Sequence, residues 1–166
     1  MPQTVKFSIS TLSTPKDMRA GARLMAASDP WRKLGLSDRQ CLKALKVPFR
    51  ITYAAYSKGR IAGLVTVAMY GTFKGYIQSL FVAEEFRGSG LGARLLGFAE
   101  KKIFASSPNV FLCVSSFNIG ARRFYRRLGY EQAGKLKDFV VKGSDEFLMR
   151  KTRGPLQGYS ATKRNV

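Results

Sequence analysis

The sequence predicts a mixed α/β domain in which strands and amphipathic helices alternate along most of the chain. Its 166 residues match the usual length of one domain, and 45% of them are apolar, enough to build one hydrophobic core. Apolar residues recur with the period of a strand in some stretches and with that of a helix in others. We therefore expect a single domain over residues 1–152 and a basic, flexible C-terminal tail over residues 153–166.

The first half of the chain predicts a strand, two helices and three further strands. The Asp29-Pro30 pair ends the first helix, because a residue before proline is driven out of the α region. Ser37 supplies a polar side chain that caps the second helix. Residues 57–59 separate two runs rich in β-branched and aromatic residues, which is typical of a hairpin. The expected elements are a strand through Val5, Phe7 and Ile9, helices over residues 15–28 and 37–46, and strands over residues 51–56, 61–70 and 76–83.

The second half predicts a helix, a buried strand, a short helix and two closing strands. Helical spacing places Leu91, Leu95 and Ile103 on one face of the first of these helices, with Lys and Arg on the other face. Gly143 and Ser144 mark the turn between the closing strands. The expected elements are helices over residues 90–105 and 119–128, a strand over residues 110–114, and two strands within residues 130–151.

Charge and cysteine content narrow the classes of function. The chain has 29 Lys and Arg against 10 Asp and Glu, a formal net charge of +19, so it attracts anions such as cofactor phosphates, nucleic acid or acidic protein surfaces. It contains no histidine, which excludes Ser-His-Asp and Cys-His catalysis. Cys41 and Cys113 lack metal-ligand spacing and are too few to cross-link the domain. We therefore expect no metal site and a reducing, cytoplasmic location.

No segment predicts insertion into a membrane. Polar residues interrupt the first ten positions, so the apolar core of a secretory signal is missing. Residues 61–83 are long and apolar enough to suggest a span, but the glycine-containing segment 71–75 divides them like a turn. Two strands of a buried sheet are the better interpretation, and we expect no membrane partner.

A glycine-rich segment between a strand and a helix has the composition of a phosphate-binding turn. Glycines let a ligand approach the backbone, and free N–H groups at a helix N-terminus attract phosphate. The P-loop pattern is excluded because Ala93-Arg94 stands where Lys-Ser or Lys-Thr is required. A dinucleotide fingerprint is matched only nominally, and a tight turn without a ligand is the other alternative. The segment consists of Arg87, Gly88, Ser89, Gly90, Leu91, Gly92 and Ala93.

A second motif begins at Asn118 and ends at Tyr130. Together with Leu80-Phe81-Val82 and the glycine-rich segment, it closely resembles the GNAT superfamily of acetyl-CoA-dependent N-acetyltransferases over about residues 5–151. The resemblance implies a GNAT-like, mostly antiparallel mixed sheet of about seven strands, flanked by helices and splayed between the fourth and fifth strands. The motif consists of Asn118, Ala121, Phe124, Tyr125, Leu128, Gly129 and Tyr130.

The resemblance also implies roles for particular residues. Residues 87–93 would receive the pyrophosphate of coenzyme A, while Leu80, Phe81, Val82 and Asn118 would contact its pantetheine arm. An amide near Phe81 or Val82 would stabilise the oxyanion. Tyr125 would be the general acid that protonates the departing thiolate. The helical spacing around Tyr125 leaves open the alternative that it is only a core aromatic.

The general base is left open by the sequence. Ribosomal-protein alanine acetyltransferases of this superfamily carry a glutamate five residues before the motif asparagine, where this chain has Cys113. We interpret Cys113 as a packing residue, because nothing nearby in sequence lowers its pKa. Glu84 is a candidate that would reach a proton through water, and a solvated loop acid is the alternative for it. A free amine or a water relay, with no basic side chain, is the other possibility.

The second substrate is the least determined part of the prediction. Trp31 lies in a loop that the resemblance assigns to the acceptor side, where it is either a wall of the site or a plug between two helices. The net charge disfavours polyamines and aminoglycosides, and favours protein N-termini, lysines on acidic surfaces or anionic small amines. We expect an N-acetyltransferase that acts on a primary amine, with an acidic protein or the ribosome as a partner. The alternative is a non-catalytic GNAT-like protein that binds RNA or the ribosome.

Overall fold

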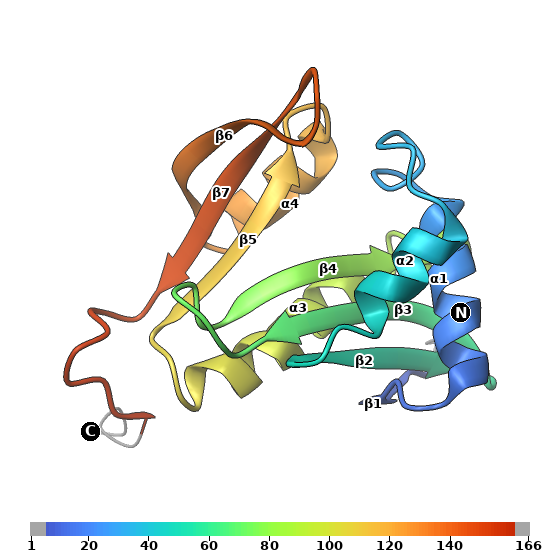
Figure 1. The fold of residues 1–166 in the computed structure, drawn as a ribbon. Coiled ribbons are helices and arrows are strands. Elements are labelled where there is room, and N and C mark those ends of the chain that lie inside the picture. The colour runs from blue at the N-terminus through green and yellow to red at the C-terminus, as the bar shows by residue number, and fades with distance from the viewer. Residues whose placement is uncertain (1–5, 162–166) are drawn as a thin grey trace. The chain divides into compact units, whose positions relative to one another are not determined.

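The computed structural model describes residues 6–161, and its elements follow the order that the sequence predicts (Figure 1). The predicted start of the first strand at Val5 and the tail residues 162–166 lie outside the described residues. In chain order the elements are β1 (Ser8–Thr11), α1 (Pro15–Ala26), α2 (Asp38–Leu45), β2 (Arg50–Ser57), β3 (Arg60–Ala68), β4 (Tyr76–Val82), a 3₁₀ helix (Glu84–Phe86), α3 (Leu91–Phe104), β5 (Asn109–Ser115), α4 (Ile119–Arg127), β6 (Glu131–Val141) and β7 (Ser144–Thr152).

Seven strands pair in the order β1-β2-β3-β4-β5-β7-β6. β1 is antiparallel to β2, and β7 is antiparallel to both β5 and β6. β4 and β5 form a parallel pair, whose ladder joins Tyr76 and Ile77 to Phe111 and Leu112 while β4 continues to Val82. The mixed, mostly antiparallel seven-stranded sheet flanked by helices is thereby confirmed.

The described chain divides into two compact units. The first contains residues 6–67 and 79–98, and the second contains residues 68–78 and 99–161. The single domain over residues 1–152 and the flexibility of residues 153–166 stay predictions.

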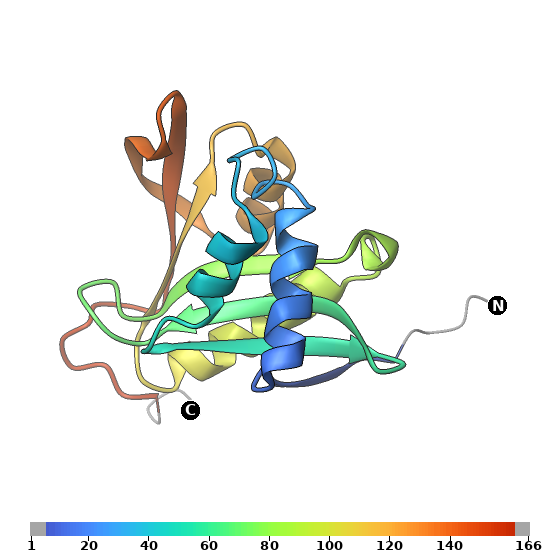
Figure 2. The same cartoon turned by 45° about the vertical axis from the view of Figure 1, so that its right-hand side comes forward.

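In the first unit, β3 is covered on both faces. α1 and α2 lie on the same face of β2 and β3 (Figures 1 and 2). A Cβ added to Gly21 of α1 would lie 2.9 Å from Leu64 Cδ1, whereas one added to Gly63 would lie 2.8 Å from Leu95 Cδ1 of α3. Neighbouring residues of a strand point to opposite faces, so helices pack on either side of β3. This two-sided burial explains why β3 is a continuous apolar run.

Local signals in the first unit agree with the sequence. The Ser37 hydroxyl accepts a hydrogen bond from the Gln40 N–H at 3.3 Å, while Gln40 Oε1 accepts one from the Ser37 N–H at 2.9 Å, which completes a capping box. Lys58 and Gly59 have φ values of 50° and 75°, as the two central residues of a tight hairpin require. α1 ends at Ala26, before the Asp29-Pro30 pair.

In the second unit, β7 lies between β5 and β6. Its register with β5 covers Asn109 to Ser115, and its hairpin with β6 closes where Val141 pairs with Ser144. The two predicted closing strands around Gly143 and Ser144 are therefore confirmed. Part of the predicted tail contacts the end of α3, where the Tyr159 hydroxyl donates a 2.7 Å hydrogen bond to the Phe104 carbonyl.

None of the helices in residues 6–161 combines the length and the apolar character that crossing a membrane requires. Over the same residues, the Cys, Asp and Glu side chains do not gather into groups of three or more that could hold a metal ion.

Candidate functional site

The glycine-rich segment joins the 3₁₀ helix to α3 in the first unit. Gly88 and Gly90 have φ values of 75° and 80°, in the left-handed region that favours glycine. A Cβ added at either position would meet no atom of the described chain within 4 Å. The backbone there is open, so a ligand can approach it closely.

Backbone donors converge at the start of α3. The first hydrogen bond of the helix runs from the Arg94 N–H to the Gly90 carbonyl at 3.1 Å, so the N–H groups of the preceding residues have no intrahelical acceptor. The turn is braced by two side chains, because Ser89 Oγ donates to the Phe86 carbonyl at 2.6 Å and Arg87 Nε donates to the Val82 carbonyl at 3.3 Å. Open donors at the positive end of a helix dipole suit the diphosphate of coenzyme A.

The end of β4 leads into this turn within the same unit. Phe81 is buried in the core, and Leu80 and Val82 are half-buried on either side of it. The Trp31 ring meets the Phe81 ring edge to face, with centroids 6.1 Å apart. Trp31 therefore covers a β4 residue that the resemblance assigns to the cofactor. Its part in acceptor binding stays a prediction.

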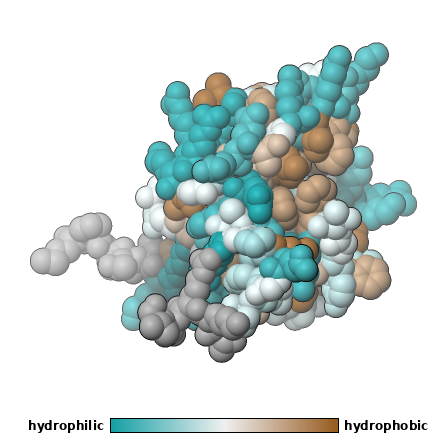
Figure 3. All heavy atoms as spheres, turned by 90° about the vertical axis from the view of Figure 1, so that its left-hand side faces the viewer, coloured by the Kyte–Doolittle hydropathy of each residue, from teal (hydrophilic) through white to brown (hydrophobic). Residues whose placement is uncertain are grey.

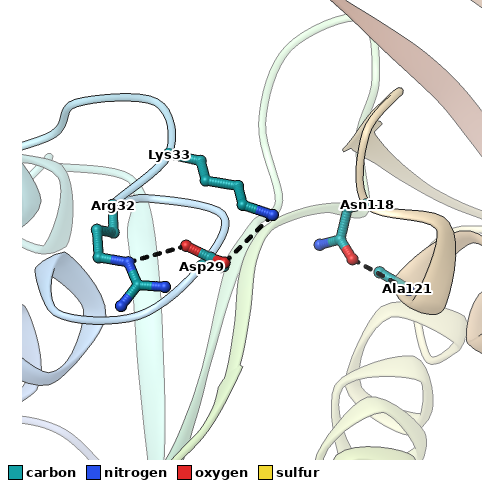
Figure 4. A network of polar contacts seen from close by, with 5 residues as sticks. All are labelled: Asp29, Arg32, Lys33, Asn118 and Ala121. Atoms are coloured by element: carbon teal, nitrogen blue, oxygen red, sulfur yellow. Dashed lines mark hydrogen bonds and ion pairs between the residues drawn. The ribbon is translucent and has the colours of Figure 1, made fainter.

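Acidic groups near the turn and on the acceptor-side loop are largely paired. Glu85 forms a 2.9 Å ion pair with Arg60, whereas Glu84 is exposed at the start of the 3₁₀ helix, where its role as a base stays a prediction. Asp29 Oδ1 lies 3.2 Å from Arg32 Nε, and Asp29 Oδ2 lies 3.5 Å from Lys33 Nζ (Figure 4). Partial burial raises the pKa of Asp29, but Arg32 and Lys33 lower it more, so the pKa lies below its ordinary value. The loop thus presents a net positive charge.

Asn118 and Tyr125 lie in the second unit, on α4. Asn118 caps the helix, because its Oδ1 accepts a 3.2 Å hydrogen bond from the Ala121 N–H (Figure 4). Tyr125 is 8% exposed, and its ring meets those of Phe124 and Tyr130 edge to face. Burial raises the pKa of Tyr125, so its hydroxyl keeps its proton at neutral pH and is able to donate it.

One side chain of α4 departs from the pattern expected of a solvated arginine face. Helical spacing predicts that Arg122 lies with Arg123, Arg126 and Arg127 on the solvent face of the helix, but Arg122 is half-buried. Its guanidinium lies 4.2 Å from the centre of the Phe147 ring, and its Nη1 donates to the Ser116 carbonyl at 3.5 Å. The Phe147 ring on β7 thus attracts Arg122 away from the solvent. The other three arginines are exposed.

The second unit also holds a buried polar cluster that the sequence reasoning missed, formed by Tyr76, Cys113, Ser115 and Glu146. Ser115 Oγ donates a 2.6 Å hydrogen bond to Glu146 Oε1, and both residues are buried. Tyr76 interacts with the thiol and the main chain of Cys113. Burial raises the pKa of Glu146, although the Ser115 hydrogen bond opposes the shift. The only signal in the sequence was a glutamate within the last strand, and its burial depends on the register with β5.

The structure thus sorts the predicted residues into two sets. Within the first unit it brings together Trp31, residues 80–82, Glu84 and residues 87–93. Within the second unit it places Asn118 and Tyr125 on one helix. The roles assigned to the residues of both sets stay predictions.

Comparison with known proteins identifies the family. Residues 18–130 match the acetyltransferase (GNAT) family. Over 111 residues the chain is 38% identical to the uncharacterized N-acetyltransferase MJ1530 of Methanocaldococcus jannaschii, a match that covers 63% of this chain and 70% of the relative. It is 31% identical over 105 residues to the N-alpha-acetyltransferase MAK3 of Arabidopsis thaliana, covering 61% and 55% of the two chains.

A solved structure has the same fold. An aminoglycoside 6'-N-acetyltransferase complexed with coenzyme A superposes with a TM-score of 0.70 at 19% identity, covering 89% of this chain and 98% of the other. The family match extends over more than half of the sequence and includes the glycine-rich turn and Asn118 to Tyr130. The chain therefore belongs to the GNAT family of acetyltransferases and is an N-acetyltransferase that depends on acetyl-CoA.

Proposed function

We propose that this enzyme transfers the acetyl group of acetyl-CoA to the α-amino group at the N-terminus of a protein, with Tyr125 as the general acid. The observation that carries the proposal is the open, donor-lined turn at the start of α3. Gly88 and Gly90 leave space above the backbone there, and the first N–H groups of the helix have no acceptor within residues 6–161. A turn that served only to connect β4 to α3 would not need this open space.

Different residues of the chain would bind different parts of acetyl-CoA. When bound, acetyl-CoA supplies an acetyl group activated as a thioester. The backbone of residues 87–93 would hold the diphosphate, with Arg87 and Arg94 as nearby positive charges. The backbone of Leu80 and Val82 and the amide group of Asn118 would hold the pantetheine arm. Asn118 Oδ1 caps α4, whereas the NH₂ group makes no hydrogen bond in the described part of the chain and is available for this contact.

Tyr125 would supply the proton that the leaving sulfur needs. Burial favours the neutral phenol, so the proton is present at the pH of the cell. The ring is fixed by edge-to-face contacts with Phe124 and Tyr130, whose centroids lie 5.3 Å and 5.7 Å away. A rigid, protonated hydroxyl is what general-acid catalysis requires.

The net charge of the chain and its sequence relatives together favour a protein N-terminus as the acceptor. The Arabidopsis relative is an N-alpha-acetyltransferase, whereas the structural neighbour acts on aminoglycosides, which carry several positive charges. A chain of net charge +19 repels such acceptors. The loop with Asp29 is positive on balance, because Arg32 and Lys33 both pair with its single carboxylate. We infer that N-terminal segments rich in Asp and Glu bind best.

The same charge suits a partner with an acidic surface, such as an acidic protein or the ribosome. Arg123, Arg126 and Arg127 are exposed on α4, and Lys137 and Lys142 are exposed at the β6–β7 hairpin. On the face drawn in Figure 3, hydrophilic side chains gather in the upper part of the view around smaller apolar areas. Such a surface would bring the enzyme to its acceptor through long-range attraction, which salt weakens.

Release of free thiol from acetyl-CoA tests the acceptor. Two peptides are compared that share a free N-terminus and differ in having four Glu or four Lys near it. The proposal expects turnover of the acidic peptide with a kcat/KM at least about tenfold higher, and a ratio that falls as salt is added. Peptides with a blocked N-terminus and a free Lys side chain are the control. Turnover of these alone, or of aminoglycosides alone, would overturn the choice of acceptor.

A further inference from the structure

The buried polar cluster of the second unit occupies one face of the sheet. β5 and β7 pair Ser115 with Glu146 and Val114 with Phe147. Phe147 faces α4, since Arg122 of that helix lies over its ring. Because successive residues of a strand alternate between faces, Glu146 and Ser115 point to the face opposite α4. Cys113 lies two residues from Ser115, and so shares that face.

Contacts within the cluster are short and almost closed to solvent. Ser115 and Glu146 are 3% and 4% exposed, and the hydrogen bond between them measures 2.6 Å. Cys113 and Tyr76 are only half-buried, so the cluster is most open at their end. Electrostatic interactions connect Glu146 with both Cys113 and Tyr76.

Ser144 provides a second, independent observation at the same place. It lies two residues before Glu146 on β7 and therefore on the same face. It is 8% exposed, and its Oγ has no hydrogen-bond partner among the residues that the structure describes. Buried hydroxyl groups are almost always paired, so this orphan on the same face as Glu146 indicates a place where a polar atom from outside the described chain binds.

Within residues 6–161, Glu146 forms no ion pair. The polar groups on its face are the hydroxyls of Ser115, Ser144 and Tyr76 and the Cys113 thiol, and its partner on β6 is Leu136. None of these is a cation. Burying a carboxylate without a cation costs stability, so retention of Glu146 requires another reason.

We propose that Glu146 takes up the proton that the acceptor amine loses, through Tyr76 and Cys113. This inference rests on the proposed function. The ammonium group of the acceptor gives a proton to Tyr76 Oη, which passes its own to Cys113 Sγ, and the thiol proton goes to Glu146 Oε. The amine becomes neutral, the carboxylate becomes a carboxylic acid, and Tyr76 and Cys113 are unchanged. The amine nitrogen then bonds to the acetyl carbon as the C–S bond breaks, and Tyr125 gives its proton to the leaving sulfur. The nitrogen loses its second proton, which returns the Tyr125 phenolate to the neutral form, and Glu146 releases its proton to solvent, so that each turnover yields one free thiol and one proton.

The pKa directions in the cluster agree with this path. Burial raises the pKa of both Tyr76 and Cys113, so each holds a proton that it can pass on only while receiving another. Burial also raises the pKa of Glu146, which makes its carboxylate a stronger base than an exposed one. Since the carboxylate is the active form, the rate rises with pH through this pKa.

The direct test compares Glu146→Gln with Glu131→Gln, an exposed glutamate on β6. With the acidic peptide and acetyl-CoA, Glu146→Gln is expected to lower kcat at neutral pH by about 100-fold or more and to remove the acidic limb of the pH profile. Glu131→Gln should leave both unchanged. Affinity for acetyl-CoA, measured by calorimetry, should be the same in all three proteins. A Glu146→Gln enzyme with the wild-type rate and pH profile would overturn the proposal.

Three more conservative variants keep the test decisive if Glu146→Gln does not fold. In Ser115→Ala the carboxylate loses a hydrogen bond that lowers its pKa, so the acidic limb should move to higher pH. In Cys113→Ser a hydroxyl can still carry the proton, whereas in Cys113→Ala it cannot. The serine variant should therefore keep most of the rate and the alanine variant should lose at least about tenfold. An unmoved limb, or equal rates for Ser and Ala, contradicts the path.

A measurement without turnover separates this proposal from the proposed function. The chain has five glutamates, and the carbon NMR signal that is missing in Glu146→Gln identifies Glu146. That signal should titrate above the ordinary value of 4.5. If it does, but no amine releases thiol from acetyl-CoA, the proposed function fails. If peptides are acetylated while Glu146 titrates normally, only the role of Glu146 fails.

Discussion

The Tyr130 hydroxyl donates a 2.9 Å hydrogen bond to Glu100 Oε1, while Lys151 Nζ lies 2.8 Å from Glu100 Oε2. These three residues join α3, the loop after α4 and β7 within the second unit. Both oxygens of one carboxylate are thus used. The last residue of the Asn118 to Tyr130 motif therefore stabilises the fold, whereas the role of Tyr125 as the general acid stays a prediction.

Tyr130→Phe should destabilise the protein without affecting the reaction. The change leaves Glu100 Oε1 with no donor in a mostly buried position, which should lower the free energy of unfolding by about 1–2 kcal/mol. Denaturation in urea measures the loss. The kcat of the variant below its melting temperature should equal that of the wild type, and an unchanged free energy of unfolding would contradict the structural role.

Tyr125→Phe should have the opposite effect. Burial alone raises the pKa of Tyr125, and no hydrogen bond contributes to the shift, so the phenyl ring should keep the free energy of unfolding within about 0.5 kcal/mol. Loss of the general acid should lower kcat by about 100-fold or more while acetyl-CoA still binds. Thiol release and calorimetry supply the two measurements. A variant that turns over normally would make Tyr125 a core residue.

Two glycine substitutions should separate binding of acetyl-CoA from stability. Gly88→Ala places a Cβ above the open turn at φ 75°, and should weaken acetyl-CoA binding about tenfold or more. Gly97→Ala is the matched control, because this exposed position in α3 has nothing within 4 Å of an added Cβ. It should raise the free energy of unfolding by about 0.5–1 kcal/mol and leave binding unchanged. Equal affinities in both variants would argue against the turn as the diphosphate site.

Glu146 should make the protein less stable as pH rises. Its folded pKa lies above the unfolded value of 4.5, so the folded state binds more protons between those two values. The contribution of Glu146 is therefore most favourable below pH 4.5 and is lost as pH rises through the folded pKa. As pH rises across this window, the free energy of unfolding of Glu146→Gln should increase relative to that of the wild type. A difference that is constant with pH would show that burial does not shift Glu146.

The elements of the fold could be predicted because their signals are local. Ser37 and Gln40 cap α2 from three residues apart, and Lys58 and Gly59 form the turn between β2 and β3 by their own backbone conformation. The glycine-rich turn was found in the same way, since strand, glycines and helix are consecutive. The ends of helices were predicted less exactly. Pro30 excludes a helix beyond residue 28, but α1 already ends at Ala26.

Features set by strand register could not be predicted. Glu146 and Ser115 are 31 positions apart, and only the pairing of β5 with β7 brings the carboxylate to the hydroxyl. A shift of one residue would turn Glu146 toward α4. Arg122 was misplaced for a related reason, because the Phe147 ring that attracts it belongs to a distant strand. Helical periodicity describes one helix and does not include what packs against it.

The most direct test of the proposed function is thiol release from acetyl-CoA by the purified protein in the presence of a peptide with a free, acidic N-terminus. We expect one thiol released for each peptide acetylated at its α-amino group, as mass spectrometry of the product would show. We also expect that Tyr125→Phe and Glu146→Gln both lower this rate while acetyl-CoA remains bound. A protein that binds acetyl-CoA but acetylates no peptide N-terminus would contradict the proposed acceptor. A protein that does not bind acetyl-CoA would contradict the assignment of the turn at residues 87–93.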